Sequence, residues 1–421
     1  MLHSIPSHRH GPLGDAMAGA VSRCVHCGFC LAACPTYREL GQEMDSPRGR
    51  IVLMKEVLEG ALPWEAAQVH VDRCLGCLAC EPACPSGVPY RDLLSPFRSL
   101  AASRLRRSFA GTLRHWLVGQ TLPHPARFRV AVRLGQWAKR LRLPVPRMLR
   151  PMLDLIPDAL PDAAVWAGSV PAFGTRRARV ALLSGCAQEV LSPDIQSATI
   201  AVLTRQGVEV VIPSGQGCCG GLSWHTGDLA AAREFALQNL DAFPSDVDAV
   251  ISNAAGCGSA LHEYPMMLRG TPDAARAEAF SRQVMDVSAF LAALGWRGGF
   301  RELRLRAAYH DACHLANAQG VRQQPRDLLR AIPGLELLEI PEADQCCGSA
   351  GTYNLDQPDT AAALGRRKAQ SVLSTGAEAV VSGNIGCLTQ LALHLRAQGS
   401  ALPLRHTVQV LRDALPDSPP S

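Results

Sequence analysis

The sequence predicts an α+β protein of several domains, in which a small helical domain is followed by a duplicated α/β domain. Two observations carry this prediction. Near the N-terminus, two runs of four cysteines share one spacing, with the second run 50 residues after the first. From Arg177 onward, strand-like segments and cysteines recur with an offset of 127 to 130 residues. A chain of 421 residues with 47% apolar residues is long enough to build several domains, each with its own core.

Both N-terminal runs have the spacing C-x2-C-x2-C-x3-C-P. This spacing is typical of paired [4Fe–4S] clusters, in which three cysteines of a run bind one cluster and the fourth binds the other. Paired zinc sites or disulfides are the alternatives, but zinc sites do not need the shared fourth cysteine and its proline. We therefore expect two [4Fe–4S] clusters. The first is expected on Cys24, Cys27, Cys30 and Cys84, and the second on Cys74, Cys77, Cys80 and Cys34.

The domain that carries these runs is expected to be a small α-helical, ferredoxin-type domain over residues 21–96, preceded by a flexible tail over residues 1–20. Between the runs, a capping serine followed by proline predicts a helix over 46–58 with one apolar face. Arg48 and Arg50 stand at the start of this helix. Two interpretations remain open for them: they lie near the anionic clusters and raise their potentials, or they are ordinary solvated side chains.

A strongly basic segment follows, within residues 97–175. Thirteen Lys or Arg and no Asp or Glu lie between Arg98 and Arg150, whereas the rest of the chain has an excess of eight acidic residues. Apolar residues at helical spacing predict two helices, over about 105–117 and 128–141, and prolines then mark a linker. The helices can lie on an anionic membrane surface, dock on an acidic partner or pack on their own domain. Nucleic-acid binding is not expected, because no recognised module accompanies the charge.

Sixteen cysteines in a chain without a signal peptide indicate thiolate ligands in a reducing compartment. No apolar run approaches the length of a spanning helix. We expect a cytoplasmic protein, which can also bind peripherally to the cytoplasmic face of the inner membrane.

The repeat predicts two related halves, residues 176–300 and 301–421. In the first half, apolar strand-like runs at 180–183, 208–212 and 249–251 precede the cysteines, which suggests parallel α/β units. Parallel sheets collect their sites at the carboxyl ends of the strands, so the four cysteines of a half are expected to meet. They are Cys186, Cys218, Cys219 and Cys257 in the first half, and Cys313, Cys346, Cys347 and Cys387 in the second.

These eight cysteines are candidates for an additional redox site, and three interpretations stay open. They hold a further iron–sulfur centre in at least one half, they act as a thiol or disulfide redox pair, or one half is a structural remnant. His310 and His314 flank Cys313. Each is a candidate metal ligand or quinone contact, and a hydrogen-bonded structural histidine is the alternative.

Several segments together resemble the iron–sulfur subunit of bacterial glycolate oxidase. They are CVHCGFCLAACPTY at 24–37, MDSPRGR at 44–50, DRCLGCLACEPACPSGVPY at 72–90, and the two CCG blocks. The resemblance covers about residues 20–410. The C-terminal region is also similar to the cysteine-rich CCG domain of heterodisulfide reductase, but the C-x2-C that closes each half of the fullest CCG pattern is absent, because Cys257 and Cys387 lack a second cysteine. One ligand per half is therefore missing.

The resemblance implies a subunit of a glycolate dehydrogenase complex with no catalytic residue of its own. Partner subunits that contain FAD are expected to oxidise glycolate to glyoxylate, and this chain to pass the electrons to a quinone-type acceptor. Two alternatives are kept. The first is the same role in a lactate or glycerol-3-phosphate dehydrogenase complex. The second is an enzyme that reduces a disulfide or a quinone at the CCG cysteines.

Overall fold

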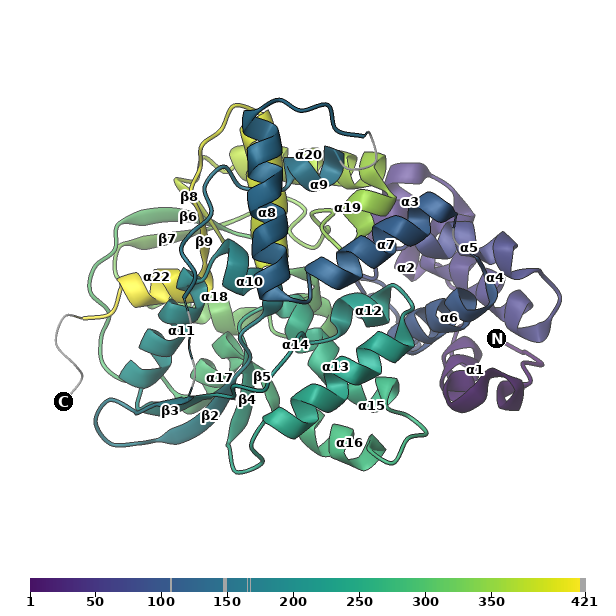
Figure 1. Ribbon diagram of the computed structural model, residues 1–421, viewed down its shortest axis with the longest axis horizontal. Helices are drawn as coiled ribbons and strands as arrows, with labels where there is room; N and C mark the ends of the chain where they lie inside the picture. The colour runs from purple at the N-terminus through teal and green to yellow at the C-terminus, as the bar shows by residue number, and fades with distance from the viewer. Residues whose placement is uncertain (107, 147–149, 165, 167, 417–421) are drawn as a thin grey trace.

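The computed structural model describes residues 1–106, 108–146, 150–164, 166 and 168–416. It contains a helical N-terminal body and two β-sheets covered by helices (Figure 1). This mixture of helices and sheets confirms the predicted α+β fold class. Within the described ranges, no helix is both long and apolar enough to cross a membrane.

The N-terminal body consists of short helices packed around one apolar core. The predicted helix between the cysteine runs is present as α4 (Pro47–Glu59). Ser46 caps its first turn, because Ser46 Oγ accepts a hydrogen bond from Gly49 N at 2.9 Å, and Met54 on its apolar face is fully buried. The elements of the body are η1 (Ser7–Leu13), α1 (Gly14–Ser22), α2 (Phe29–Ala33), α3 (Pro35–Leu40), η2 (Glu43–Asp45), α4 (Pro47–Glu59), α5 (Trp64–Asp72) and α6 (Arg91–Arg104).

Residues 1–20, for which we expected a flexible tail, are instead ordered as η1 and most of α1. Met17 and Ala20 are fully buried in the core of the N-terminal body. His10 Nε2 hydrogen-bonds to the carbonyl oxygen of Leu58 at 2.9 Å. The burial of this segment against α4 stabilises it, although its own sequence has little apolar periodicity.

Three helices follow the N-terminal body: α7 (Phe109–Thr121), α8 (Pro125–Arg140) and α9 (Arg150–Asp154). The first two are the helices that the sequence predicts in the basic segment. We expected the basic segment to begin at residue 97, but α6 (Arg91–Arg104) continues through this residue without a break. In Figure 1, α8 stands upright near the centre of the view, and α7 leads from its lower end toward the N-terminal body.

The first sheet has the strand order β1-β3-β2-β4-β5, in which β1 pairs antiparallel with β3 and the other pairs are parallel. Its central strands are buried on both faces, which explains their continuous apolar sequence. The strands are β1 (Gly168–Val170), β2 (Ala178–Leu182), β3 (Val208–Ile212), β4 (Ala249–Ser252) and β5 (Val284–Asp286). Its helices are α10 (Cys186–Leu191), α11 (Asp194–Arg205), α12 (Gly221–His225), α13 (Leu229–Ala242), α14 (Ala255–His262), α15 (Tyr264–Met267), α16 (Ala274–Gln283) and α17 (Val287–Leu294).

The second sheet has the order β7-β6-β8-β9, and all of its pairs are parallel. This order matches β3-β2-β4-β5 of the first sheet, as expected for a duplication. The strands are β6 (Leu305–Tyr309), β7 (Leu335–Glu339), β8 (Ala379–Ser382) and β9 (Leu404–His406). Its helices are the π-helical turn η4 (His314–Ala318), α18 (Gln323–Arg330), α19 (Tyr353–Asp356), α20 (Pro358–Leu373), α21 (Ile385–Ala397) and α22 (Thr407–Asp413).

The last helix of each half packs against a helix of the other half. α17 of the first half packs on α18 of the second, and α22 of the second half packs on α11 of the first. One apolar core therefore contains residues of both halves, such as Ile195 and Leu411. Near the same junction, Ala255 N donates a hydrogen bond to Gly383 O at 3.2 Å, so the loops that follow β4 and β8 touch each other.

Candidate metal centres

The two N-terminal cysteine runs adopt the same loop conformation. In the first run, His26 and Gly28 have φ values of 58° and 86°, and in the second run Gly76 and Leu78 have φ values of 66° and 58°. These are equivalent positions, so each loop twice enters the left-handed region, which non-glycine residues rarely occupy. The loop therefore curls tightly around the space that its cysteines enclose.

The cysteines line two adjoining cavities. Cys80, Pro47 and Tyr90 border both of them, so the two cavities share a wall. The fourth cysteine of each run faces the cavity of the other run, as the spacing predicts. One cavity is bordered by Cys24, Cys27, Cys30 and Cys84, and the other by Cys34, Cys74, Cys77 and Cys80.

These donor sets fit iron–sulfur clusters, because each cavity is bordered by at least four soft sulfur donors and, of these cysteines, only Cys80 borders both. Burial raises the pKa of the Cys77 and Cys80 thiols well above the ordinary value. Buried thiolates therefore need positive charge beside them, which bound iron would provide.

Both arginines of the α4 start lie beside these cavities. Arg50 is fully buried, with Nη1 3.9 Å from Cys34 Sγ, and its Nη2 donates to Thr36 Oγ1 at 3.0 Å. Arg48 is more exposed and donates to the carbonyl oxygen of His26 at 3.1 Å. Of the two interpretations left open by the sequence, the structure supports proximity to the cysteine sites rather than a solvated helix start.

The four cysteines of the first half meet at the carboxyl end of its sheet. Cys186 Sγ lies 3.6 Å from Cys218 Sγ. Cys219 is in hydrogen-bonding contact with both Cys218 and Cys257. The adjacent cysteines therefore have different outer neighbours, because Cys218 reaches Cys186 and Cys219 reaches Cys257.

The second half repeats this chain of contacts. Cys313 contacts Cys346, and Cys347 contacts both Cys346 and Cys387. The glycine after each cysteine pair is left-handed, with φ values of 74° at Gly220 and 86° at Gly348. The prediction that the cysteines of each half meet is confirmed.

The two histidines beside Cys313 have different surroundings. A ring nitrogen of His310 lies within 4.8 Å of the Sγ atoms of Cys347 and Cys387. His314 instead faces His225 of the first half, with ring centroids 5.4 Å apart. Burial lowers the pKa of His225 to about 4, so this imidazole is neutral at neutral pH.

A central cavity of about 1100 Å³ lies where the N-terminal body, α7 and the two halves meet. All four cysteines of the first half border it, together with Cys313, Cys74 and the two facing histidines, His225 and His314. The sequence did not indicate His225 or this cavity. A single histidine on a short helix gives no spacing signal, and the cavity forms only where three separate parts of the chain meet.

The N-terminal body is joined to the second half beside these sites. Asn317 Nδ2 donates to the carbonyl oxygen of Cys77 at 3.0 Å, and Tyr353 Oη donates to that of Arg73 at 3.0 Å. Cys77 and Cys346 belong to one buried apolar cluster, and Cys313 packs against it. The second N-terminal cysteine site thus lies directly against the second half.

Comparisons with known proteins agree with this division of the sites. A family described as "4Fe-4S dicluster domain" matches residues 20–88, and a family described as "Cysteine-rich domain" matches residues 180–262 and 307–392. The chain is 37% identical to "Probable glycolate oxidase iron-sulfur subunit" of Bacillus subtilis, covering 94% of each chain. It is 37% identical to "Glycolate oxidase iron-sulfur subunit" of Escherichia coli, covering 93% of each. It is 29% identical to "Lactate utilization protein A" of Oceanobacillus iheyensis, covering 55% of this chain and 96% of that protein.

Proposed function

The chain belongs to the family of glycolate oxidase iron–sulfur subunits, and from this premise we propose that it transfers electrons between FAD-containing partner subunits and a quinone-type acceptor. Family membership makes it part of an oxidoreductase complex with catalytic partner subunits. In this proposal the partners oxidise glycolate to glyoxylate. Bound clusters carry one electron at a time, over a wide range of potentials.

The observation that carries the proposal is an unbroken series of cysteine sites through the molecule. Cys80 borders both N-terminal cavities. Cys77 shares an apolar cluster with Cys346 of the second half, and Cys74 borders the central cavity. Electrons that enter at the N-terminal body would thus have closely spaced sites as far as the first half.

We assign Cys24, Cys27, Cys30 and Cys84 to one N-terminal cluster and Cys74, Cys77, Cys80 and Cys34 to the other. The two cavities, bordered by these sets, support the assignment. Arg50 places a buried positive charge beside the second set, and the N–H of Gly76 donates to Cys74 Sγ at 3.4 Å. Such charges and hydrogen bonds to sulfur favour the reduced, more negative state and so raise the potential.

The test is substrate-dependent reduction of the assembled complex. The full chain is combined anaerobically with its partner subunits, and the EPR signals of the N-terminal clusters are followed after addition of glycolate. We expect glycolate to reduce them, and Cys27→Ser to remove one of the two signals. Reduction by lactate or glycerol 3-phosphate, but not by glycolate, would assign the chain to another complex of the same architecture.

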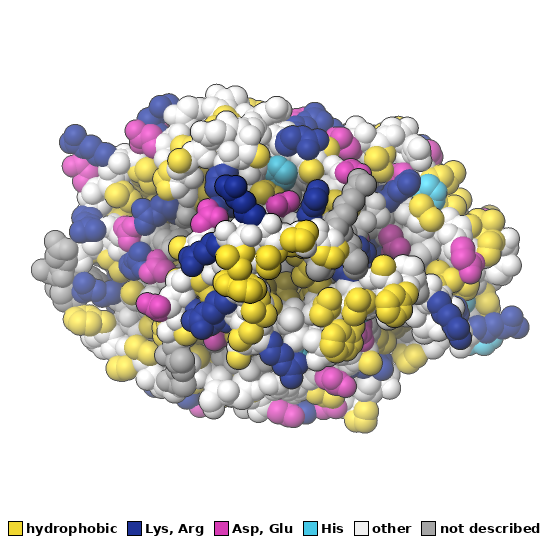
Figure 2. Space-filling model, turned by 45° about the horizontal axis from the view of Figure 1, so that its top comes forward, with side chains coloured by type: hydrophobic (Ala, Val, Ile, Leu, Met, Phe, Trp, Pro, Cys, Tyr) yellow, Lys and Arg dark blue, Asp and Glu magenta, His cyan; other side chains and the backbone are white. Residues whose placement is uncertain are grey.

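We place the basic helices against an anionic membrane surface. Phe109, Trp116 and Trp137 are exposed by 85%, 58% and 58%, and Arg or Lys residues lie within a few positions of each in the sequence. Figure 2 shows apolar side chains gathered beside Lys and Arg on this face. Because α7 also borders the central cavity, a lipid-dissolved quinone would reach the first-half cysteines from there.

Sedimentation with lipid vesicles tests this placement. The intact complex should bind vesicles that contain anionic lipid, and binding should weaken as salt is raised. Trp116→Ser with Trp137→Ser should reduce binding by about tenfold, because each removes buried apolar area at the interface. Equal binding of wild type and double variant would favour docking on a partner protein instead.

A second candidate function has one supporting observation, the access of all four first-half cysteines to the central cavity. In this alternative, the first half itself reduces a small disulfide or a quinone. Cys219→Ser would then abolish turnover with an external disulfide. Under the first proposal, no such turnover occurs in the wild-type protein.

A further inference from the structure

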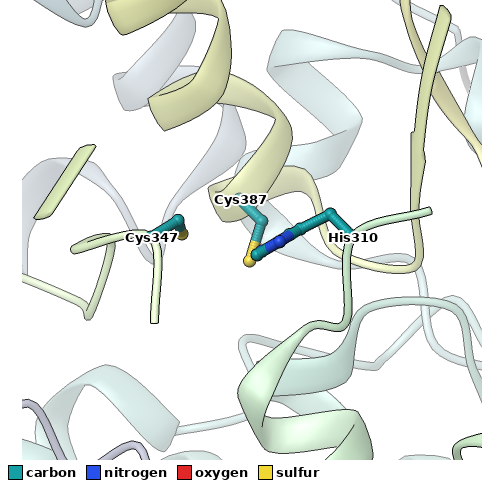
Figure 3. Close-up of side chains that lie close together, drawn as sticks. All are labelled: His310, Cys347 and Cys387. Carbon is teal, nitrogen blue, oxygen red and sulfur yellow. The ribbon is translucent and has the colours of Figure 1, made fainter. Parts of the chain in front are cut away.

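A nitrogen donor joins the sulfur donors of the second half. A ring nitrogen of His310 and the Sγ atoms of Cys347 and Cys387 lie within 4.8 Å of one another, and all three side chains are buried (Figure 3). We propose that His310 is a metal ligand of the second half, so that the two halves hold unlike centres. The inference deepens the proposed electron-transfer function and rests on it for the identity of the metal, which is iron.

The fold holds the histidine in this place from two sides. His310 directly follows β6, and its backbone N–H donates to Val381 O of β8 at 2.8 Å. The chain that leaves β8 enters α21, which carries Cys387. The next residue, Asp311, is turned to Arg326, whose Nη1 and Nη2 donate to its carboxylate at 2.8 and 2.7 Å. The imidazole and the thiol therefore approach each other from neighbouring parallel strands.

The imidazole has an atom available for a ligand bond. Among the residues that the structure describes, none makes a hydrogen bond to Nδ1 of His310, although this atom is buried. Buried polar atoms nearly always have a partner, and one without a partner calls for an explanation such as an ion. Neutral imidazole is a common metal ligand and suits iron.

Positive and polar groups lie around the thiols of the second half. Lys368 is 2% exposed and lies near Cys346 and Cys347, and its ammonium group donates to the carbonyl oxygen of Glu342. Asn384 Nδ2 donates to Cys387 Sγ at 3.3 Å. Such outer contacts orient and charge-balance metal ligands.

The first half has no nitrogen donor at the position equivalent to His310. Aligning Cys186 with Cys313 places Leu183 opposite His310. Leu183 is 1% exposed and packs in an apolar cluster with Cys218 and Cys219. At these equivalent positions, the duplication offers four sulfur donors in the first half, and four sulfur donors plus one nitrogen in the second. Among the described residues, the histidine that lies within 4.8 Å of two cysteine Sγ atoms is His310 of the second half.

This difference in donors would make the two halves differ in potential. Both halves have four cysteines, so His310 is an added neutral donor and not a substitute for one of them. A centre completed by imidazole has a higher reduction potential than one completed by a further thiolate, because neutral imidazole adds less negative charge. His310 also supplies a fifth donor in a half that lacks the second cysteine of a closing C-x2-C. The second half, of whose cysteines only Cys313 borders the central cavity, is therefore assigned five ligands. The first half is assigned four.

Pulsed EPR on the full chain tests the assignment through the nitrogen itself. The protein is purified anaerobically from cells supplied with 15N-histidine, and from unlabelled cells, and both oxidised and dithionite-reduced samples are measured. We expect a hyperfine coupling that changes with the isotope. His310→Leu, which installs the residue of the first half, should remove this coupling and lower the bound iron. His314→Leu is the matched control and should retain both.

His310→Cys guards against a folding failure of the leucine variant, since it should retain iron and still lose the nitrogen coupling. Absence of a histidine coupling in both redox states of the wild type, or its survival in His310→Leu, would overturn the assignment. Zinc in place of iron at this site would overturn it too. In each case, intact EPR signals of the N-terminal clusters that respond to glycolate would leave the proposed function standing, whereas their absence would count against that function.

Discussion

The first cysteine-rich half turns its four cysteines toward the central cavity, whereas the second half buries three of its four, of which Cys346 packs beside the N-terminal body. All first-half cysteines border the cavity, but of the second half only Cys313 does. Cys346, Cys347 and Cys387 are exposed by 4%, 1% and 2%. Cys346 instead packs in one cluster with Cys77.

The two halves thus share a scaffold and differ in access and in supporting contacts. The order of the four parallel strands and the cysteine contacts are the same in both. In the first half, Thr199 on α11 joins a neutral network with Asn253 and Gln196. The equivalent position on α18 is Arg326, which forms a buried ion pair. The duplicated fold therefore presents four cysteines to the central cavity in one half and only one in the other.

Removing the charged support of the second half should have the largest effect on stability. Arg326→Met would leave Asp311 buried without its partner, which should cost about 3 to 5 kcal/mol of unfolding free energy. Thr199→Val, at the matching position, removes one neutral hydrogen-bond partner and should cost about 1 to 2 kcal/mol. Chemical denaturation of the full chain measures both. Equal costs would show that the ion pair is not the main support of the second half.

Substituting the glycine after each cysteine pair should give a smaller difference in stability between the halves, again with the larger loss in the second half. A Cβ at Gly348 would lie 2.6 Å from Ala361 O, whereas a Cβ at Gly220 would lie 3.1 Å from Ala232 O. The left-handed backbone alone costs an alanine roughly 1 to 2 kcal/mol. We expect Gly220→Ala to show about this loss, and Gly348→Ala to show a larger one, with a visible change in bound iron. A larger loss at Gly220 would contradict the tighter packing of the second half.

A pH effect should come from the first half. Burial raises the pKa of Glu263 to about 7, although Trp224 Nε1 donates to its carboxylate. The folded protein therefore binds this proton more tightly than the unfolded chain, and stability is lost as pH rises through about 7. We expect a loss of about 1 to 2 kcal/mol between pH 5 and 8, to which Asp286, with a pKa raised by burial to about 6, adds in the same direction.

Glu263→Gln provides the control for this effect, because glutamine keeps an acceptor for Trp224 and does not titrate. Its denaturation midpoint should vary less with pH than that of the wild type. An unchanged pH profile would mean that Glu263 is not the group responsible.

The parts of this molecule that could be predicted from sequence are those fixed by local spacing or by repetition. The C-x2-C-x2-C loops and the cysteines after strands belong to this class, because neighbouring residues determine where those side chains point. The ordered residues 1–20 could not be predicted, since Met17 and His10 are held by contacts with distant segments. Nor could the sequence separate His310 from His314. Both flank Cys313, and only the pairing of β6 with β8 brings one of them to Cys387.

The central claim, two N-terminal clusters followed by unlike cysteine-rich halves, is tested most directly by counting iron and acid-labile sulfide in the anaerobically purified chain. Two [4Fe–4S] clusters account for about eight irons. We predict more than this number and a loss of about four irons with one reduced signal in Cys27→Ser. In Cys347→Ser we predict the loss of the second half's share of the excess, with the irons of the N-terminal clusters retained. A count of about eight that Cys347→Ser leaves unchanged, or two intact clusters in Cys27→Ser, would contradict the account.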